Sequence, residues 1–276
     1  MDAIRLKETL ARGGTVFGCM IVSMGTTRFR AGLQGSGADF VVIDWEHGSR
    51  DRKEVQELTG MLRSVDITPI VRVPVPMPVY VAMALDAGAA GVLVPYCEDL
   101  DEIRACVAAG KWHPMKGEYR ARAVTEGVFP SEKTKTYLQA RHRESIVIIG
   151  IESEPAYRNL DAILKIDGID AIFIGPNDMT TSMGIPDEFD NPKYLDLIQD
   201  VIRRSEARGK PVLIHQWRVP DSKRAIERGS RFVLHGMDMQ FMADGMREQL
   251  RQLREAAARV RGGIEVVEGR DTAETI

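Results

Sequence analysis

The sequence has few cysteines and no long apolar run, and both absences restrict the class of protein. Its three cysteines, Cys19, Cys97 and Cys106, are an odd number without the spacing of a metal site, which disfavours a disulfide-stabilised secreted fold. No apolar run approaches the roughly 20 residues that cross a bilayer. The N-terminus, MDAIRLKETL, is amphipathic and charged rather than a secretory signal. We therefore expect a cytoplasmic protein without a membrane partner.

The sequence also lacks an excess of charge and two features that often identify an enzyme class. Its 37 basic and 40 acidic residues leave a net charge of −3, so it shows no electrostatic footprint for nucleic acid. A G-x-G-x-x-G loop follows none of the apolar segments, which disfavours an open sheet that binds a dinucleotide. No lysine stands at the end of a predicted strand, so a Schiff-base mechanism is not favoured.

What the sequence does contain is an alternation of apolar segments and helical patterns along 276 residues. Eight segments are expected to be strands: 15–22, 38–44, 68–74, 91–95, 146–152, 171–178, 211–215 and 231–235. With about eight helices between them, they predict a closed (β/α)₈ TIM barrel of the α/β class. We expect one barrel domain over 1–262, including a final helix at 238–260, and a loosely held tail at 263–276. Residues 25–35 are expected to be a helix and 111–130 a long loop.

Polar side chains concentrate where the predicted strands end. In V-V-I-D-W-E-H-G, residues 41–48, a buried strand runs directly into two carboxylates and an imidazole. Because the strand ends of a barrel converge on one mouth, where the loops carry the chemistry, side chains that follow different strands are expected to meet there. The candidates are Asp44, Glu46, His47, Arg72, Glu152, Asp178, His215 and His235.

Glu152 and Asp178 end consecutive predicted strands, so both carboxylates are expected to reach one cation. Two carboxylates, together with water and substrate oxygens, are the usual way in which a protein holds Mg²⁺ or a similar hard divalent ion. The alternative is that each carboxylate caps the helix after it, beginning at Pro155 and at about Thr180. For the pair, the metal site is the favoured interpretation.

His47 and Arg72 are candidates for a base and a fixed cation. The pKa of histidine lies near neutrality and a neighbouring carboxylate raises its basicity, so His47 is the candidate general base; the alternative is a hydrogen-bonded loop histidine. Arg72 can donate two parallel hydrogen bonds to a carboxylate or an enolate. The alternative interpretation is that Arg72 forms a structural salt bridge. His215 and His235 directly follow apolar segments without an acidic neighbour, and we expect no catalytic role for them.

These groups together suit the making or breaking of a bond next to a carbonyl. A metal would polarise the keto oxygen of a 2-oxo acid, and Arg72 would help it to stabilise the enolate that forms. His47 would move a proton on the other side of the reacting carbon. The residues therefore favour chemistry through a metal-stabilised enolate.

Five motifs occur in order between about residues 15 and 245: V-V-I-D-W-E-H-G, V-R-V-P, L-D-A-G-A-A-G-V-L-V-P, I-E-S followed by Asn159, and F-I-G-P-N-D-M-T-T-S-M-G-I-P. They resemble the metal-dependent (class II) pyruvate aldolases of the HpcH/HpaI family, which include 4-hydroxy-2-oxoheptanedioate and 2-keto-3-deoxy sugar acid aldolases. The resemblance implies a barrel of the phosphoenolpyruvate/pyruvate type and cleavage of a 4-hydroxy-2-oxo acid into pyruvate and an aldehyde. It also implies a divalent cofactor (Mg²⁺, Mn²⁺ or Co²⁺) and a homohexamer whose last helix is exchanged between neighbours.

The resemblance also assigns roles to the residues that match the motifs of the family. It implies that Glu152 and Asp178 are the metal ligands and that Arg72 contacts pyruvate and its enolate. The backbone that holds the pyruvate carboxylate would be that of Gly175, Pro176 and Asn177.

For the acid/base apparatus, the resemblance implies His47 supported by Asp44 and by Asp86 of an adjacent subunit. Two departures from the pattern concern the substrate. Members often carry Gln at the position of Gly150, and the usual proline-rich loop is altered at 112–122. Two other functions therefore stay open: a related carbon–carbon lyase for another 2-oxo acid or an acyl-CoA substrate, and a non-catalytic barrel that binds oxo acids.

Overall fold

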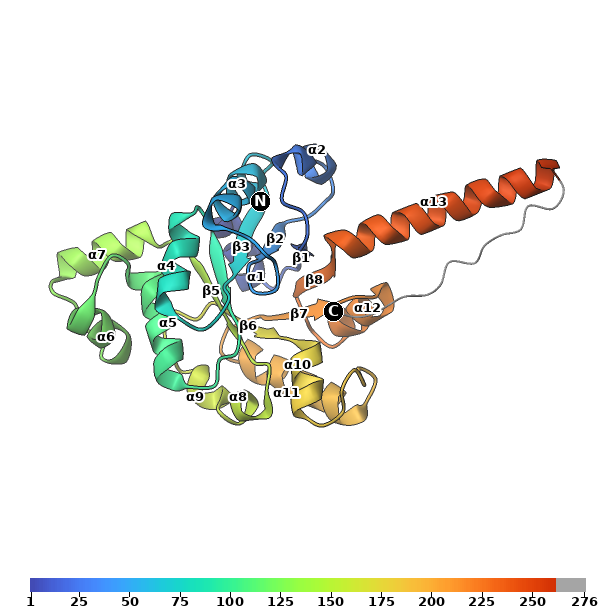
Figure 1. Cartoon of the computed structure of the whole chain (residues 1–276). Coiled ribbons are helices and arrows are strands. Elements are labelled where there is room, and N and C mark those ends of the chain that lie inside the picture. The colour runs from blue at the N-terminus through green and yellow to red at the C-terminus, as the bar shows by residue number, and fades with distance from the viewer. Residues whose placement is uncertain (262–276) are drawn as a thin grey trace. The chain divides into compact units, whose positions relative to one another are not determined.

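The computed structural model describes residues 1–261 and contains a closed barrel (Figure 1). Its eight strands are parallel, and each pairs with the next in chain order until β8 closes on β1. They are β1 (Val16–Ile21), β2 (Phe40–Asp44), β3 (Thr68–Arg72), β4 (Gly91–Val94), β5 (Ile146–Gly150), β6 (Ala171–Ile174), β7 (Val212–Gln216) and β8 (Phe232–Met237). The predicted fold class is confirmed.

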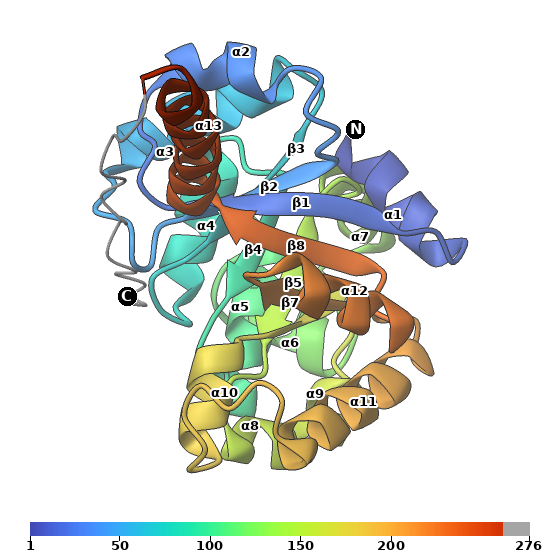
Figure 2. The ribbon, with the colours of Figure 1, turned by 90° about the vertical axis from the view of Figure 1, so that its right-hand side faces the viewer.

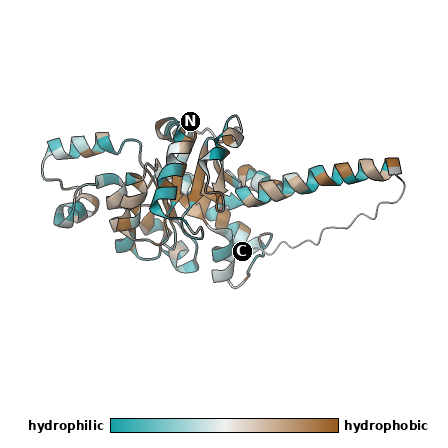
Figure 3. Cartoon of the chain, turned by 45° about the horizontal axis from the view of Figure 1, so that its top comes forward, coloured by the Kyte–Doolittle hydropathy of each residue, from teal (hydrophilic) through white to brown (hydrophobic). Residues whose placement is uncertain are grey.

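Side chains along each strand alternate between the inside of the barrel and the layer of helices around it, because successive Cβ atoms of a strand point to opposite faces. Phe40 and Phe173 belong to the apolar cluster that fills the barrel. Val41, which follows Phe40, and Ile172, which precedes Phe173, belong to the cluster between the strands and the helices. Figure 3 shows strands that are mainly hydrophobic, surrounded by helices in which hydrophilic and hydrophobic residues alternate. Burial on both faces explains why the strands consist mainly of Val and Ile.

The helices of the barrel follow the strands in the predicted alternation. They are α1 (Ala3–Ala11), α2 (Arg30–Leu33), α3 (Arg52–Arg63), α4 (Pro78–Asp86), α5 (Leu100–Trp112), α6 (Gly117–Thr125), α7 (Glu132–Arg141), α8 (Glu154–Arg158), α9 (Leu160–Ile163), α10 (Pro176–Ser182), α11 (Pro192–Glu206) and α12 (Val219–Glu227). Helix α1 lies where β1 and β8 begin (Figure 2), and its Leu6 and Leu10 join the cluster inside the barrel. It therefore covers the N-terminal end, and the other end carries the polar residues.

The side chains at the inward-facing positions near the C-terminal ends of the strands line the barrel mouth. Asp44 on β2, Arg72 on β3 and His215 on β7 each stand two residues after an inward-facing apolar side chain, so they point into the barrel mouth. By the same alternation Gly150 on β5 and Gly236 on β8 are inward-facing. Since these glycines have no side chains, they leave room at the mouth for polar side chains from neighbouring segments, and Glu152 lies against Gly150.

Two predicted strands end earlier than expected. β5 ends at Gly150 rather than Glu152, and β6 ends at Ile174 rather than Asp178. Pro176 occupies the first position of α10, where its fixed φ and missing N–H are tolerated, so the chain turns from strand to helix before Asp178. Asp178 therefore lies in the first turn of a helix.

Two other predictions about local structure are wrong. Residues 111–130 are not one long loop, because α5 extends to Trp112 and α6 occupies Gly117–Thr125. Helix α6 buries only Ala123, so its sequence carries no apolar stripe that would reveal it. Residues 25–35 form only a 3₁₀ turn at Thr27–Phe29 and the single turn of α2.

The chain divides into two compact units, 1–238 and 239–276. The second unit is represented by α13 (Asp238–Arg261), a helix with exposed Phe241, Met242, Met246 and Leu250. The expected tail at 263–276 lies outside the described residues, and the single-domain boundary at 262 stays a prediction. Across the described chain, no helix has the length and apolar character to span a membrane.

Candidate active site

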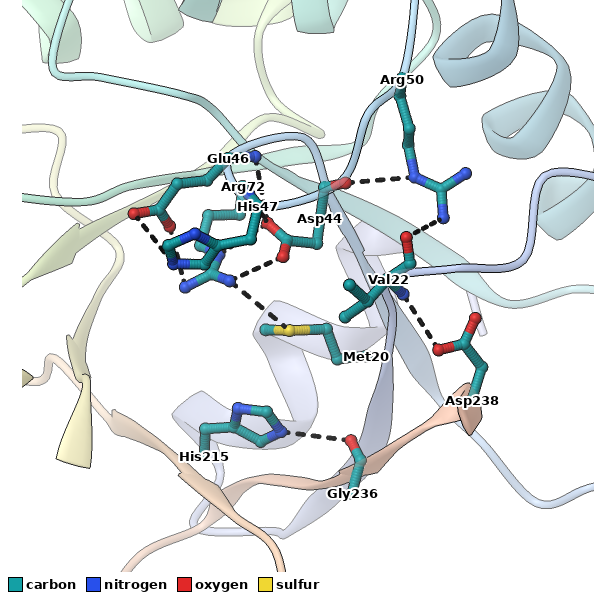
Figure 4. Close-up of polar contacts among 10 residues, drawn as sticks. All are labelled: Met20, Val22, Asp44, Glu46, His47, Arg50, Arg72, His215, Gly236 and Asp238. Carbon is teal, nitrogen blue, oxygen red and sulfur yellow. Dashed lines mark hydrogen bonds and ion pairs between the residues drawn. The ribbon is translucent and has the colours of Figure 1, made fainter. Parts of the chain in front are cut away.

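Arg72 lies at the centre of the barrel mouth and pairs with two carboxylates (Figure 4). Its Nε donates to Asp44 Oδ1 at 2.9 Å and its Nη2 to Asp44 Oδ2 at 2.8 Å, a two-pronged pair. Its Nη1 lies 2.8 Å from Glu46 Oε2, and Nη2 makes a weak contact with the sulfur of Met20. The contact with Glu46 is an ion pair without a hydrogen bond, because Glu46 Oε2 is buried without a hydrogen-bond partner, so the Nη1 N–H groups have no acceptor among the described residues.

The buried charges of this cluster depend on one another. Burial acts to lower the pKa of Arg72, but the hydrogen bonds and charges of Asp44 and Glu46 raise it overall. Burial raises the pKa of Glu46, and the neighbouring Arg72 acts in the opposite direction. The ion pair that we considered as the alternative for Arg72 is therefore present, and the free N–H leaves the guanidinium able to bind an anionic ligand as well.

His47 stands at the rim of the mouth, with 57% of its side chain exposed. Its Nε2 lies 3.6 Å from Glu46 Oε1. Asp44 does not contact the ring; its Oδ1 accepts from the backbone N–H groups of Glu46 and His47 and so fixes the turn that carries them. Within one chain, Glu46 is thus the carboxylate nearest the His47 ring.

Asp86 is not part of this cluster within a single chain. It ends α4, is exposed, and its carboxylate lies 3.8 Å from Arg52 and 4.0 Å from His113. The role implied for Asp86 concerned an adjacent subunit, and it stays a prediction.

The Glu152 side chain is buried in the mouth and tightly confined. Its Oε2 accepts from the backbone N–H of Tyr96 at 2.8 Å. Tyr96 has φ +55°, a strained conformation for a residue with a side chain, and such strain is typical of functional sites. A Cβ at Gly175 would lie 2.5 Å from Glu152 Oε1, and one at Gly150 2.9 Å from Oε2. The two glycines therefore provide the space that the carboxylate occupies.

Burial raises the pKa of Glu152 to about 8; the Tyr96 N–H and Arg72 lower it, whereas Glu46 and Asp178 raise it further. Arg72 therefore compensates the charge of this buried carboxylate only in part. A divalent cation held by Glu152 and Asp178 would supply the remaining positive charge, and carboxylate oxygens are the ligands that such hard ions prefer. The residues of the mouth therefore fit a divalent cation.

The alternative role of the two acids as helix caps is not what the structure shows. The N-cap of α8 is Ser153, whose side chain accepts from Ala156 N, and the N-cap of α10 is Gly175. Within residues 1–261, no three His, Cys, Asp or Glu side chains form a candidate metal cluster. A site built on two carboxylates takes its remaining ligands from water and substrate.

Gly175 and Pro176 are buried at the start of α10, where the N–H groups of the first turn have no partner within the helix. An anion is stabilised at such a helix end. The Asn177 side chain points elsewhere, since its Nδ2 donates to Asp187 Oδ1 at 3.0 Å. The backbone here stays our prediction for the pyruvate carboxylate site.

Two side chains that the sequence did not indicate, a buried one and a half-buried one, fix the loops at the mouth. Asp238 accepts three backbone N–H groups, from Val22, Ser23 and Met24, at 2.6–3.1 Å. Arg50 donates to the carbonyl groups of Val22 and Asp44. Asp238 follows β8 directly, so its position at a strand end was the available signal.

The family model described as HpcH/HpaI aldolase/citrate lyase matches residues 25–244. The chain belongs to this family. The predicted family is thus confirmed, and with it the expected class of enzyme, the aldolases.

Similar proteins support the same membership of the HpcH/HpaI family. The chain is 31% identical over 261 residues to the 2-keto-3-deoxy-L-rhamnonate aldolase of Klebsiella pneumoniae, covering 91% of this chain and 94% of that protein. It is 33% identical over 217 residues to the 4-hydroxy-2-oxo-heptane-1,7-dioate aldolase of Salmonella paratyphi C, covering 77% and 81%. An HpcH/HpaI aldolase/citrate lyase family protein from Burkholderia cenocepacia has the same fold, with TM-score 0.78 and 24% identity over 91% of this chain and 99% of that one.

Substituting Gly175 by alanine is expected to weaken divalent-metal binding by about 10-fold to 100-fold, the scale of disturbing a group that orients a metal ligand. The added methyl group would meet Glu152 Oε1 at 2.5 Å and turn the carboxylate away. Titration with Mn²⁺, followed by electron paramagnetic resonance, measures the dissociation constant. Gly60→Ala is the control, because a Cβ there meets nothing within 4 Å and the residue lies inside α3. An unchanged Mn²⁺ affinity in Gly175→Ala contradicts the role of Glu152.

Proposed function

We propose that the protein is a divalent-metal-dependent aldolase that cleaves a 4-hydroxy-2-oxo acid into pyruvate and an aldehyde. The observation that carries the proposal is the buried carboxylate of Glu152, with its raised pKa, in the same mouth as Arg72. Relatives named for 2-keto-3-deoxy-L-rhamnonate and 4-hydroxy-2-oxo-heptane-1,7-dioate support this substrate class.

Glu152 and Asp178 would hold a divalent ion, which would supply a Lewis acid for the keto group. His47, exposed at the rim and close to Glu46, takes the proton from the substrate hydroxyl on C4. The C3–C4 bond then breaks, the aldehyde leaves, and the electron pair moves through C2 onto the oxo oxygen. An N–H of Arg72 Nη1 stabilises the negative charge that develops there, and the proton that His47 took is returned to C3, which yields pyruvate.

We also propose that the protein forms a homo-oligomer, the predicted hexamer, and works in the cytoplasm. On α13, the exposed Met242, Met246, Leu250 and Leu253 recur every three or four residues, a stripe suited to burial against another chain. All three cysteines are free, as expected in a reducing compartment.

Chelation is expected to remove the activity. Release of pyruvate from a 4-hydroxy-2-oxo acid should fall to background in EDTA and return when Mg²⁺, Mn²⁺ or Co²⁺ is added in excess, because neither Arg72 nor His47 replaces the charge of the ion. A lactate dehydrogenase coupled assay measures pyruvate. Borohydride with substrate is the control for a Schiff base, and inactivation by it, or full activity in EDTA, contradicts the proposal.

The main competing function is a lyase of the same family that acts on an acyl-CoA substrate, since the family description includes citrate lyase. The same acids and arginine would serve that reaction. Parallel assays with a 4-hydroxy-2-oxo acid and with acyl-CoA thioesters distinguish the two functions by which substrate is consumed.

A further inference from the structure

His215 is an inward-facing side chain of the barrel mouth to which the mechanism above assigns no role. On β7, Leu213 lies in the cluster inside the barrel and Ile214 in the cluster outside it, so His215 points inward. It is only 4% exposed. The sequence pattern indicated no catalytic role for it, because it has no acidic neighbour in the chain.

The hydrogen bond of His215 fixes which ring nitrogen carries the proton. Its Nε2 lies 3.2 Å from the carbonyl oxygen of Gly236 (Figure 4). Because a carbonyl only accepts, Nε2 must donate and Nδ1 is left with a lone pair. Burial lowers the pKa of His215 to about 4, although the Gly236 carbonyl acts to raise it, so the ring is neutral at physiological pH. The Trp217 ring packs on it with centroids 4.0 Å apart.

The unprotonated Nδ1 faces the place where substrate is expected. Figure 4 shows this edge of the ring turned toward the side of Met20 and Arg72, away from Gly236. Strands β6 and β7 pair as far as Ile174 opposite Ile214, so Gly175 and His215 are the residues that directly follow the last pair. A ligand held between Gly175 and Arg72 would therefore lie next to Nδ1. Among the described residues, no group donates a hydrogen bond to this nitrogen.

The His215 side chain is largely buried, but Nδ1 is not among the buried atoms that lack a partner, so this nitrogen remains open to solvent. A substrate that displaces this water must replace the lost hydrogen bond, and a substrate group that donates does so. A lone pair repels carboxylate and carbonyl oxygens, whereas a hydroxyl group satisfies it. We propose that His215 Nδ1 accepts a hydrogen bond from a hydroxyl group of the substrate beyond the one that reacts, so that His215 selects hydroxylated substrates. This inference rests on the proposed aldolase function. The hydroxyl belongs either to the 2-oxo acid or to the aldehyde, and two substrate pairs distinguish these sources.

The test measures kcat/KM for aldol addition with pairs that differ by one hydroxyl. Hydroxypyruvate and pyruvate form the first pair, and glycolaldehyde and acetaldehyde form the second. The variant His215→Gln keeps an amide N–H for the Gly236 carbonyl but loses the acceptor at the Nδ1 position. The variant His215→Asn keeps an acceptor near that position. In one pair, the preference for the hydroxylated member should fall about tenfold in His215→Gln and persist in His215→Asn, as expected for one hydrogen bond.

The matched control is His142→Gln, a histidine outside the mouth whose Nε2 also bonds a backbone carbonyl, that of His113. Its preference ratios should equal those of the unmodified protein. The inference is overturned when neither pair shows a preference in the unmodified protein, when His215→Gln leaves the ratios unchanged, or when both variants lose preference equally. Absence of any metal-dependent addition product from all four substrates is a different outcome, and it contradicts the aldolase function itself.

Discussion

Replacing Arg72 by alanine is expected to lower kcat/KM for pyruvate release by at least ~100-fold, the scale of removing one preorganised electrostatic stabiliser. The guanidinium is the fixed cation of the mouth: Nε and Nη2 bond Asp44, whereas Nη1 makes no hydrogen bond to a described residue. Its loss removes stabilisation that the substrate gains mainly as negative charge develops on the oxo oxygen. The loss should therefore appear in kcat as well as in KM.

The same substitution leaves the Asp44 carboxylate, which is fully buried, without its partner. Removing one member of a buried ion pair typically costs about 3–5 kcal/mol, so the melting temperature of Arg72→Ala should fall as well. Arg72→Lys separates the two effects, because an ammonium keeps the charge beside Asp44 but lacks the two-pronged geometry. We expect it to be more stable than Arg72→Ala and still at least ~10-fold less active than the unmodified protein. Near-normal kcat/KM in Arg72→Ala contradicts the assignment.

The barrel was predictable because its strands are buried on both faces. Segments such as Phe40–Asp44 and Ile146–Gly150 are continuous apolar runs bounded by polar residues, which is what a parallel sheet covered by helices requires. The polar residues that end these runs identified the mouth for the same reason, since burial inside the barrel would be costly for them. Asp44 and Arg72 were found in this way.

The limits of the strands were less predictable, because apolar character continues beyond the last paired residue. Ile151 and Pro176 are buried, so the apolar segments of the sequence extend to Glu152 and Asp178. The hydrogen-bonded pairing of the strands stops earlier. The local spacing of residues also does not show which side chains meet across the barrel. Glu152 is held by the backbone of Tyr96, which is 56 residues away.

His215 illustrates a different limit. A histidine after an apolar strand is typical of many structural positions, and its sequence neighbours gave no reason to choose otherwise. The proton position became evident only from the Gly236 carbonyl, 21 residues away on the neighbouring strand. The sequence therefore predicts that a histidine lies at the mouth, but not which ring nitrogen of His215 carries the lone pair or where that nitrogen points.

Substituting Glu152 by glutamine is expected to stabilise the metal-free protein while removing its activity. The pKa of Glu152 is raised from 4.5 to about 8 in the folded state, chiefly by burial. Between these values the unfolded chain loses the proton while the folded chain keeps it, so this group makes folding less favourable as pH rises from 4.5 to 8. Glutamine carries no charge in either state, and its amide oxygen can still accept from the Tyr96 N–H. In EDTA, the variant should exceed the unmodified protein in stability on the order of a few kcal/mol at pH 8, and by less at pH 5.

Added metal should reverse that order. Mn²⁺ at 100 times its dissociation constant stabilises a protein that binds it only when folded by about 2.7 kcal/mol, and Glu152→Gln should gain much less. Pyruvate release by the variant should fall on the order of 1,000-fold, the scale of several kcal/mol of lost charge stabilisation. Melting temperatures in EDTA and in Mn²⁺, at both pH values, measure the first effect, and the coupled pyruvate assay measures the second.

Glu154→Gln is the matched control, because Glu154 lies two residues further along the chain and is exposed. Its melting temperature should change little, and its response to Mn²⁺ should equal that of the unmodified protein. A variant Glu152→Gln that is less stable in EDTA at pH 8 would identify Glu152 as a structural acid whose ionised form the fold requires. The opposite signs expected here, stability gained without metal and activity lost with it, follow from one cause: the protein buries a carboxylate whose charge Arg72 compensates only in part, and a bound cation would supply the rest.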